Sequence, residues 1–191
     1  EKIEQIKLTT GSNSLSIVKK AQGEYIAFID SDDFIELDHI SKLCKRLKET
    51  ESDMCIAPMK SVYNTGTIEY GDNSVDIIED KVEALRMLLN DKISFSACSK
   101  LMLSSKFANI QYYVGRLYED MATVYKFIEN ADKITFIHES YYCYVIRKNS
   151  FTRSSFSEKK KDLILSTKSM CDDLTKKYPE LKDDCIRKLM W

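Results

Sequence analysis

Residues 23–33 read Gly-Glu-Tyr-Ile-Ala-Phe-Ile-Asp-Ser-Asp-Asp. The five successive apolar residues 25–29 predict a strand that is buried on both faces, as strands of parallel sheets are. Because neighbouring side chains of an extended chain point to opposite sides, Asp30 and Asp32 can present their carboxylates together where this strand ends. Ligands of open α/β sheets bind outside the carboxyl ends of the strands, and hard oxygen ligands select Mg²⁺ or Mn²⁺. The stretch therefore predicts a divalent-cation site that holds a diphosphate.

The same carboxylates have a second interpretation. Acidic residues before a helix often lie in a solvated turn that caps it, and a helix is predicted to begin after Asp38. The position directly after a buried strand favours the cation site, because adjacent like charges are costly unless a cation or water compensates them. On these residues alone both interpretations stay open.

Strands and helices alternate along the rest of the chain. Apolar residues recur at helical spacing over 40–47, and residues 54–57 form a short apolar strand closed by Pro58, so the order strand–helix–strand predicts a βαβ unit. Further elements are a hairpin over 62–70, helices over 82–89 and 118–130, and β segments over 134–137 and 141–146. The predicted fold class is α/β, with a mixed, mainly parallel sheet flanked by helices.

The character of the chain changes after Phe156. A charged stretch opens at residues 159–161, and a helix lined by Leu163, Leu165, Met170 and Leu174 follows and is broken at Pro179. We predict one domain over residues 1–156 and a helical C-terminal extension over residues 157–191.

Composition excludes several classes of protein. The chain has 191 residues, 43% of them hydrophobic, and 29 Lys and Arg balance 30 Asp and Glu to a formal net charge of −1. This is the composition of a globular domain rather than of a disordered or low-complexity chain, and the balanced charge argues against nucleic acid as a partner. No apolar run approaches the roughly 20 residues of a membrane helix. The six cysteines lack CxxC spacing, which indicates reduced packing residues and a cytoplasmic protein.

Two further blocks carry chemistry. Residues 97–101 read Ala-Cys-Ser-Lys-Leu and are followed by Gly-Arg-Leu-Tyr-Glu-Asp at 115–120, and an aromatic segment, Tyr-Cys-Tyr at 142–144, precedes a basic, hydroxyl-rich loop. Together with residues 21–33, these blocks resemble the family 2 glycosyltransferases that use nucleotide-diphospho-sugars. The resemblance implies a Rossmann-like GT-A fold. It also implies transfer of a sugar, with inversion, from a donor such as a UDP-sugar to a glycan, a lipid-linked acceptor or another hydroxyl.

The resemblance also implies roles for the acidic residues. Asp30 and Asp32 would bind Mg²⁺ or Mn²⁺ and the donor diphosphate, with Asp33 as a third metal ligand. Asp120 would be the general base that deprotonates the acceptor, and Glu119 would support it. The predicted helix over 118–130 agrees, because its dipole would favour an ionised Asp120, although Glu119 and Asp120 could serve only to complement that dipole.

The basic loop after residue 146 offers cations and hydroxyls for a departing diphosphate. Arg147, Ser150 and Thr152 are the candidates, because leaving phosphate charge needs preorganised cations and hydrogen-bond donors. A solvated basic loop is an equal alternative.

The chain departs from the family pattern near its start. The family's first strands, with their acidic nucleotide-binding position, are not found, and the Ala-Arg-Asn-x-Gly element has no counterpart between Asn13 and Ala21. We therefore expect an N-terminally incomplete domain. Two alternatives follow: a catalytically inactive module of the same fold that binds a carbohydrate or a partner, and a metal-dependent phosphoryl enzyme. The expected process is bacterial cell-surface polysaccharide synthesis (capsule, cell wall or exopolysaccharide). The expected location is the cytoplasm, where the protein could associate peripherally with the inner face of the membrane.

Overall fold

The computed structural model describes residues 22–63, 65–68, 74–107, 109–110, 118–139, 141–147 and 161–190. Their strands are β1 (Tyr25–Ala27), β2 (Phe34–Ile35), β3 (Met54–Ile56), β4 (Met59–Tyr63), β5 (Gly66–Ile68), β6 (Val75–Ile78), β7 (Lys100–Leu103), β8 (Ile134–Ile137) and β9 (Tyr142–Val145). Their helices are α2 (His39–Thr50), α3 (Lys81–Leu89), α4 (Ser104–Phe107), α5 (Val124–Asn130), α6 (Lys161–Lys177), the 3-10 helix η3 (Pro179–Leu181) and α7 (Lys182–Leu189).

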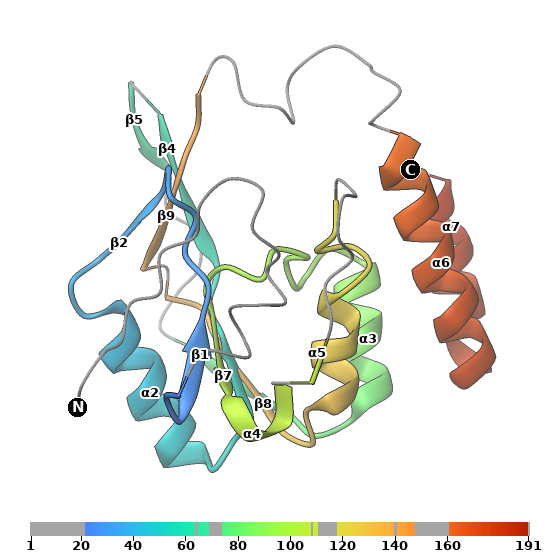
Figure 1. Cartoon of the computed structure of the whole chain (residues 1–191), viewed down its shortest axis with the longest axis horizontal. Coiled ribbons are helices and arrows are strands. Elements are labelled where there is room, and N and C mark those ends of the chain that lie inside the picture. The colour runs from blue at the N-terminus through green and yellow to red at the C-terminus, as the bar shows by residue number, and fades with distance from the viewer. Residues whose placement is uncertain are drawn as a thin grey trace.

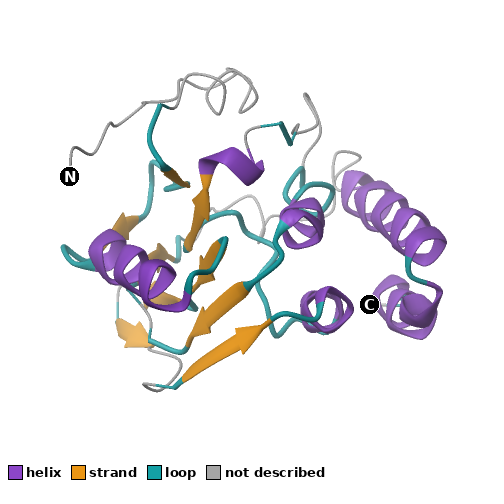
Figure 2. Cartoon of the chain, turned by 90° about the horizontal axis from the view of Figure 1, so that it is seen from below, coloured by secondary structure: helices purple, strands orange, loops and turns teal. Residues whose placement is uncertain are grey.

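The strands form two sheets, one in the order β1-β7-β3-β8-β6 and a smaller one in the order β2-β9-β4-β5. Helix α2 covers one face of the larger sheet, and α3 and α5 cover the other (Figure 1). Helices α6 and α7 form an outer layer beside α3 and α5, as the view from below shows (Figure 2). The predicted α/β class, with helices flanking a mixed sheet, is confirmed.

In one respect the structure corrects the predicted fold, because the described sheets are mainly antiparallel. Only β3 with β8 and β4 with β9 pair in parallel, and the other five described strand pairs are antiparallel. Strands β1 and β3 run in the same direction, as a βαβ unit requires, but β7 lies between them and runs opposite to both. Lys100 at the start of β7 pairs with Ile56 at the end of β3, so β7 enters the sheet from the carboxyl edge of β3.

The core divides according to the side on which alternate strand residues point. Met54 and Ile56 of β3 pack in the cluster that also contains the buried side chains of α3 and α5, whereas Cys55 and Ala57 pack against α2. The two-residue period of an extended strand explains this division. All six cysteines are buried, in agreement with the packing role that the sequence pattern indicates.

Strand β1 is less buried than its sequence predicts. Ile26 is buried, but Tyr25 and Ala27 are only half-buried, and Ile29 is 48% exposed. The reason is that β1 stands at the end of the described strand order and pairs there with β7 on one side.

The hairpin and the C-terminal helices form where the sequence places them. Tyr63 of β4 pairs with Gly66 of β5, and Gly66 adopts a φ of 147°, which L residues rarely do. Met170 and Leu174 of α6 are buried in the main cluster beside α3 and α5, but the first-turn residues 163–165 are exposed, contrary to the predicted apolar face. The predicted domain boundary at residue 156 lies outside the described residues.

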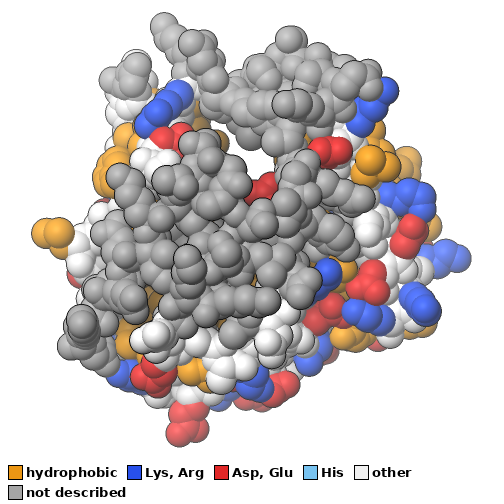
Figure 3. All heavy atoms as spheres, in the orientation of Figure 1, with side chains coloured by type: hydrophobic (Ala, Val, Ile, Leu, Met, Phe, Trp, Pro, Cys, Tyr) orange, Lys and Arg blue, Asp and Glu red, His pale blue; other side chains and the backbone are white. Residues whose placement is uncertain are grey.

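Charges of both signs are spread over the outer helical layer. On the face in Figure 3, Lys and Arg side chains alternate with Asp and Glu over the region of α6 and α7. Ion pairs join this layer to the sheet domain, including Lys177–Glu129 at 3.1 Å and Arg86–Asp184 at 3.3 Å. None of the helices in the described segments is both long and apolar enough to cross a bilayer.

Candidate active site

Loops from distant parts of the chain meet at the carboxyl edge of β1 and β3. Phe28, just after β1, forms a bridge with Cys98, and Ile56 at the end of β3 pairs with Lys100 at the start of β7. The acidic loop at residues 30–33 and the loop that precedes β7 are therefore neighbours. The structure brings the first two sequence blocks to one edge, where ligands of such sheets bind.

Tyr142 of β9 joins the third block to the acidic loop. Its fully buried side chain accepts a hydrogen bond from the Asp30 backbone N–H at 3.0 Å, and its hydroxyl donates to Asp33 Oδ2 at 2.9 Å. The other Asp33 oxygen accepts from the Val145 N–H at 2.8 Å. These contacts follow from the pairing of β2, directly after Asp33, with β9. Both carboxylate oxygens of Asp33 are thus engaged by β9.

Asp30 and Asp32 remain exposed at the edge of this network. The surrounding protein displaces water and raises the pKa of Asp30, and the carboxylates of Asp33, Asp32 and Glu119 raise it further. Arg147 Nη2 donates to the Asp32 carbonyl oxygen at 3.1 Å, and Arg147 Nη1 lies 4.0 Å from Asp32 Oδ2. A group of carboxylates that repel one another is an environment that a divalent cation stabilises.

The donor atoms fit Mg²⁺ or Mn²⁺ in chemistry, since exposed carboxylate oxygens are the ligands these ions prefer. In the part of the chain that the structure describes, no three His, Cys, Asp or Glu side chains converge as a complete metal cage. An ion bound by Asp30 and Asp32 would complete its shell with water and substrate phosphate oxygens, as Mg²⁺ commonly does.

Asp120 lies in a run of turns and not in the first turn of a helix, so that prediction is wrong. Helix α5 begins at Val124, and the preceding turns are closed by bonds such as Ala122 N to Glu119 O at 3.1 Å. The left-handed φ of 58° at Tyr118 and a bond from the Thr123 hydroxyl to the Glu119 carbonyl interrupt the helical pattern.

The packing around Asp120 favours its protonated form, whereas the predicted helix dipole would favour its ionised form. Burial raises the pKa of Asp120 to about 7, and the Glu119 carboxylate contributes in the same direction. A hydrogen bond from the Ala97 N–H to Asp120 Oδ2 at 3.3 Å and the charge of Lys100 oppose this rise. A carboxylate with a pKa near the working pH is suited to general-base catalysis.

The raised pKa of Asp120 predicts a pH-dependent effect on stability. Between about pH 4 and pH 7 the folded chain retains a proton that the unfolded chain has lost, so the free energy of unfolding decreases as pH rises through this range. Asn cannot ionise, and Asp120→Asn should therefore melt several degrees above the parent at pH 8 and at the same temperature near pH 4, with about 2–4 °C corresponding to 1 kcal/mol. Thermal melting at both pH values measures this.

Asp132→Asn is the matched control. Asp132 is exposed, and the neighbouring Lys106 lowers its pKa, so its replacement should give no stabilisation at pH 8. A melting temperature of Asp120→Asn below that of the parent at pH 8 would contradict a raised pKa of Asp120 in the folded chain.

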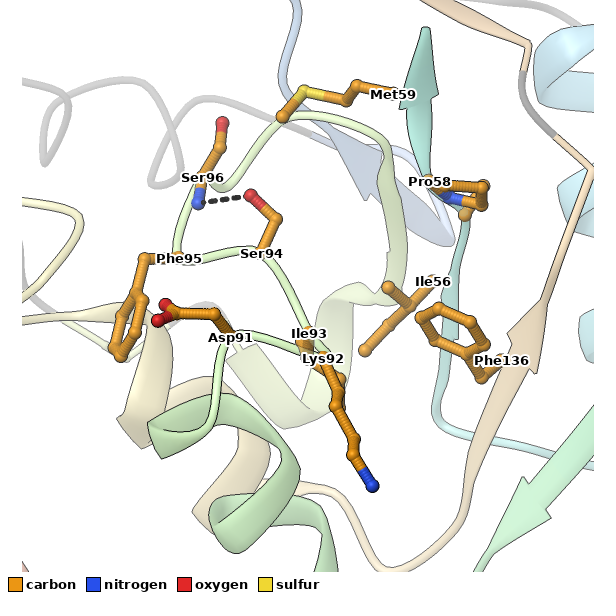
Figure 4. Close-up of a pocket in the computed structure, with 11 residues that line it drawn as sticks. Ile56, Pro58, Met59, Asp91, Lys92, Ile93, Ser94, Phe95, Ser96 and Phe136 are labelled. Carbon is orange, nitrogen blue, oxygen red and sulfur yellow. Dashed lines mark hydrogen bonds between the residues drawn. The ribbon is translucent and has the colours of Figure 1, made fainter. Parts of the chain in front are cut away.

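Lys100 is a functional candidate that the sequence analysis did not single out. Its side chain is fully buried, and its ammonium donates to the carbonyl oxygens of Ser94, at 2.8 Å, and Ser96. The loop that carries these carbonyls lines a cavity of about 510 Å³, which Ile56 and Phe136 border on the other side (Figure 4).

The sequence contains only weak signals for the roles of Tyr142, Cys98 and Lys100. Tyr142, Cys98 and Lys100 stand inside the quoted blocks, but a lone tyrosine, cysteine or lysine in an apolar segment is more often a packing or surface residue. Among the predicted donor residues, Arg147 reaches Asp32, whereas Ser150 and Thr152 lie outside the described residues.

Comparison with known proteins decides the family. The model of glycosyl transferase family 2 matches residues 6–111, more than half of the chain. The chain belongs to glycosyl transferase family 2. The matched range of this family 2 chain includes the acidic loop and the Lys100 block.

Two proteins of Streptococcus pneumoniae serotype 4 are related to the family 2 chain in sequence. The glycosyltransferase GlyA is 30% identical over 153 residues, which are 75% of this chain and 21% of GlyA. The glycosyltransferase GlyG is 27% identical over 182 residues, which are 88% of this chain and 56% of GlyG. The chain thus spans between one fifth and somewhat more than half of these relatives.

Crystal structures of Staphylococcus aureus TarS, residues 1–349, share the fold of the family 2 chain. The complex of TarS with UDP has a TM-score of 0.61 at 20% identity and covers 83% of this chain and 43% of the TarS chain. The complex with UDP-GlcNAc has a TM-score of 0.59 at 20% identity and covers 88% of this chain and 50% of the TarS chain.

Proposed function

We propose that this family 2 chain carries the donor-binding and base groups of a glycosyltransferase that moves a sugar from a UDP-sugar to a hydroxyl of a glycan or lipid-linked acceptor. The observation that carries the proposal is the location of Asp120, with a pKa of about 7, within electrostatic reach of Asp30 at the same sheet edge. Family membership and the UDP and UDP-GlcNAc complexes of the structurally similar TarS support the choice of donor.

The proposed reaction is a single displacement that inverts the anomeric centre. Asp120 accepts the proton of the acceptor hydroxyl, whose oxygen forms a bond to the anomeric carbon while the bond to the diphosphate breaks. The nucleoside diphosphate leaves with the electron pair. A Mg²⁺ or Mn²⁺ ion held by Asp30 and Asp32 would supply positive charge to this leaving group. Arg147 adds a cation beside Asp32, and Asp33 holds the acidic loop against β9.

The biological setting is part of the proposal. The relatives are bacterial, which agrees with a role in cell-surface polysaccharide synthesis. The proposed location is the cytoplasm, at the inner face of the membrane. Exposed apolar side chains on the outer helices support a peripheral contact there, namely Ile164, Leu165, Ile186, Leu189 and Met190.

Calorimetric titration with UDP, in the presence and absence of Mn²⁺, tests the donor site directly. We expect binding that requires Mn²⁺, because the carboxylates at the site repel a bare diphosphate. A second assay follows release of UDP from UDP-sugars, with GDP- and dTDP-sugars as comparisons. Binding without turnover of any donor would favour the inactive binding module. Release of inorganic phosphate instead of a nucleoside diphosphate would favour the phosphoryl enzyme.

A further inference from the structure

The loop that precedes β7 is held from inside the protein by a buried cation. Lys100 has no exposed surface, and its Nζ donates to the carbonyl oxygens of Ser94 and Ser96. Burial lowers the pKa of Lys100 to about 8, while Asp120 and Cys98 act in the opposite direction. Burial of an ammonium is costly unless hydrogen bonds and a counter-charge compensate it. The two carbonyls supply the hydrogen bonds, and Asp120 is a nearby counter-charge.

The same loop holds the Asp120 carboxylate. Ser94 and Ser96 stabilise the loop internally, since Ser94 Oγ accepts from Ser96 N and Ser96 Oγ accepts from Cys98 N, both at 3.1 Å. The N–H of Ala97, which lies between Ser96 and Cys98 in the chain, donates to Asp120 Oδ2 at 3.3 Å. Figure 4 shows Ser94 and Ser96 on this loop with the bond that links them. A displacement of the two carbonyls would move the Ala97 donor and with it the base.

We propose that Lys100 is a positioning residue for the base Asp120, which it serves by fixing the loop of residues 94–97 and by placing a positive charge within electrostatic reach of the carboxylate. This inference rests on the proposed function in its assignment of Asp120 as base. The described ionisable groups that act on Asp120 are Glu119 and Asp30, which favour its protonated form, and Lys100, which favours its ionised form. Cys98 also interacts electrostatically with Asp120. Among these described groups that interact with Asp120, Lys100 is the one that carries a positive charge.

The test compares Lys100→Met, which removes the charge and the donors, with Lys100→Arg, which keeps both. The first readout is the midpoint at which Asp120 titrates in the folded protein, taken as the pH above which the difference in melting temperature between the Asp120 form and the Asp120→Asn form stops growing, measured in each Lys100 background. We expect this midpoint to rise by about one pH unit in Lys100→Met, because an opposite charge has been removed, and to remain at the parental value in Lys100→Arg. This readout uses neither donor nor acceptor, so it stands whether or not the chain proves to be a glycosyltransferase.

The second readout separates positioning from binding. In Lys100→Met, kcat for sugar transfer should fall about 100-fold through misplacement of the base, while KM for the donor stays at the parental value. Lys60→Met is the matched control, since Lys60 is also buried but pairs with Glu36 in the smaller sheet. It should change neither the midpoint nor kcat.

Each outcome decides the question. If Lys100→Met does not fold, Lys100→Gln replaces it, because Gln keeps a donor for the loop carbonyls but carries no charge. A folded, uncharged variant with the parental midpoint and the parental kcat would overturn the proposal. An equal rise of the midpoint in Lys100→Arg would also overturn it, because that variant retains the cation.

Discussion

Asp120→Asn is expected to bind UDP with Mn²⁺ as the parent does and to lose sugar transfer by about 10²–10⁴-fold in kcat, the usual contribution of a general base. Asn preserves the shape of the side chain and can still accept the hydrogen bond from Ala97. It cannot accept the proton of the acceptor hydroxyl. Calorimetry with UDP and initial rates of UDP release in the presence of acceptor measure the two effects separately.

The pH dependence of the parent gives an independent check of this role. Because burial raises the pKa of Asp120 to about 7, kcat/KM should rise with pH through this value as the base ionises. Glu119→Gln should shift this limb to lower pH, since the Glu119 carboxylate contributes to the raised pKa. Loss of UDP binding in Asp120→Asn equal to the loss of transfer would contradict a role confined to the base.

Asp32→Ala and Asp30→Ala are expected to abolish the Mn²⁺-dependent part of UDP binding. Removal of one carboxylate leaves the cation with fewer protein ligands, and the loss of affinity should exceed about 100-fold, since even outer-shell partners of metal ligands contribute about 10–100-fold. Titration of each variant with UDP at a fixed Mn²⁺ concentration, and with Mn²⁺ alone, measures the loss.

Asp38→Ala is the control for these variants. Asp38 is an acidic residue just beyond the same loop, and its carboxylate forms an ion pair with Lys42 at 2.8 Å. Its replacement should leave the Mn²⁺-dependent affinity unchanged. If Asp38→Ala weakened binding as strongly as Asp32→Ala, the effect would come from net charge near the site and not from ligation.

The elements that sequence pattern predicted best are those with long, regular periodicity. Helix α3 begins and ends within one or two residues of the predicted range, and Asp80 caps it through bonds to the Val82 and Glu83 N–H groups. The prediction of a helix over 118–130 was wrong in its first half, because a left-handed residue at 118 and a side-chain bond to the backbone compete with helical bonds there. Such local exceptions leave the spacing of apolar residues unchanged, so a prediction from that spacing does not detect them.

By itself, the sequence determined the α/β class and the resemblance to the family, and it identified the acidic residues at 30, 32 and 120 as the candidates, because periodicity and residue type are local properties. Only the tertiary structure decided that β7 inserts between β1 and β3, which brings Lys100 to the acidic groups, and that β9 pairs with β2, which brings Tyr142 to them. It also decided that Asp120 has a pKa near 7 rather than a lowered one. The physical reason is that ionisation depends on burial and on neighbouring charges, and both depend on contacts between residues far apart in the chain.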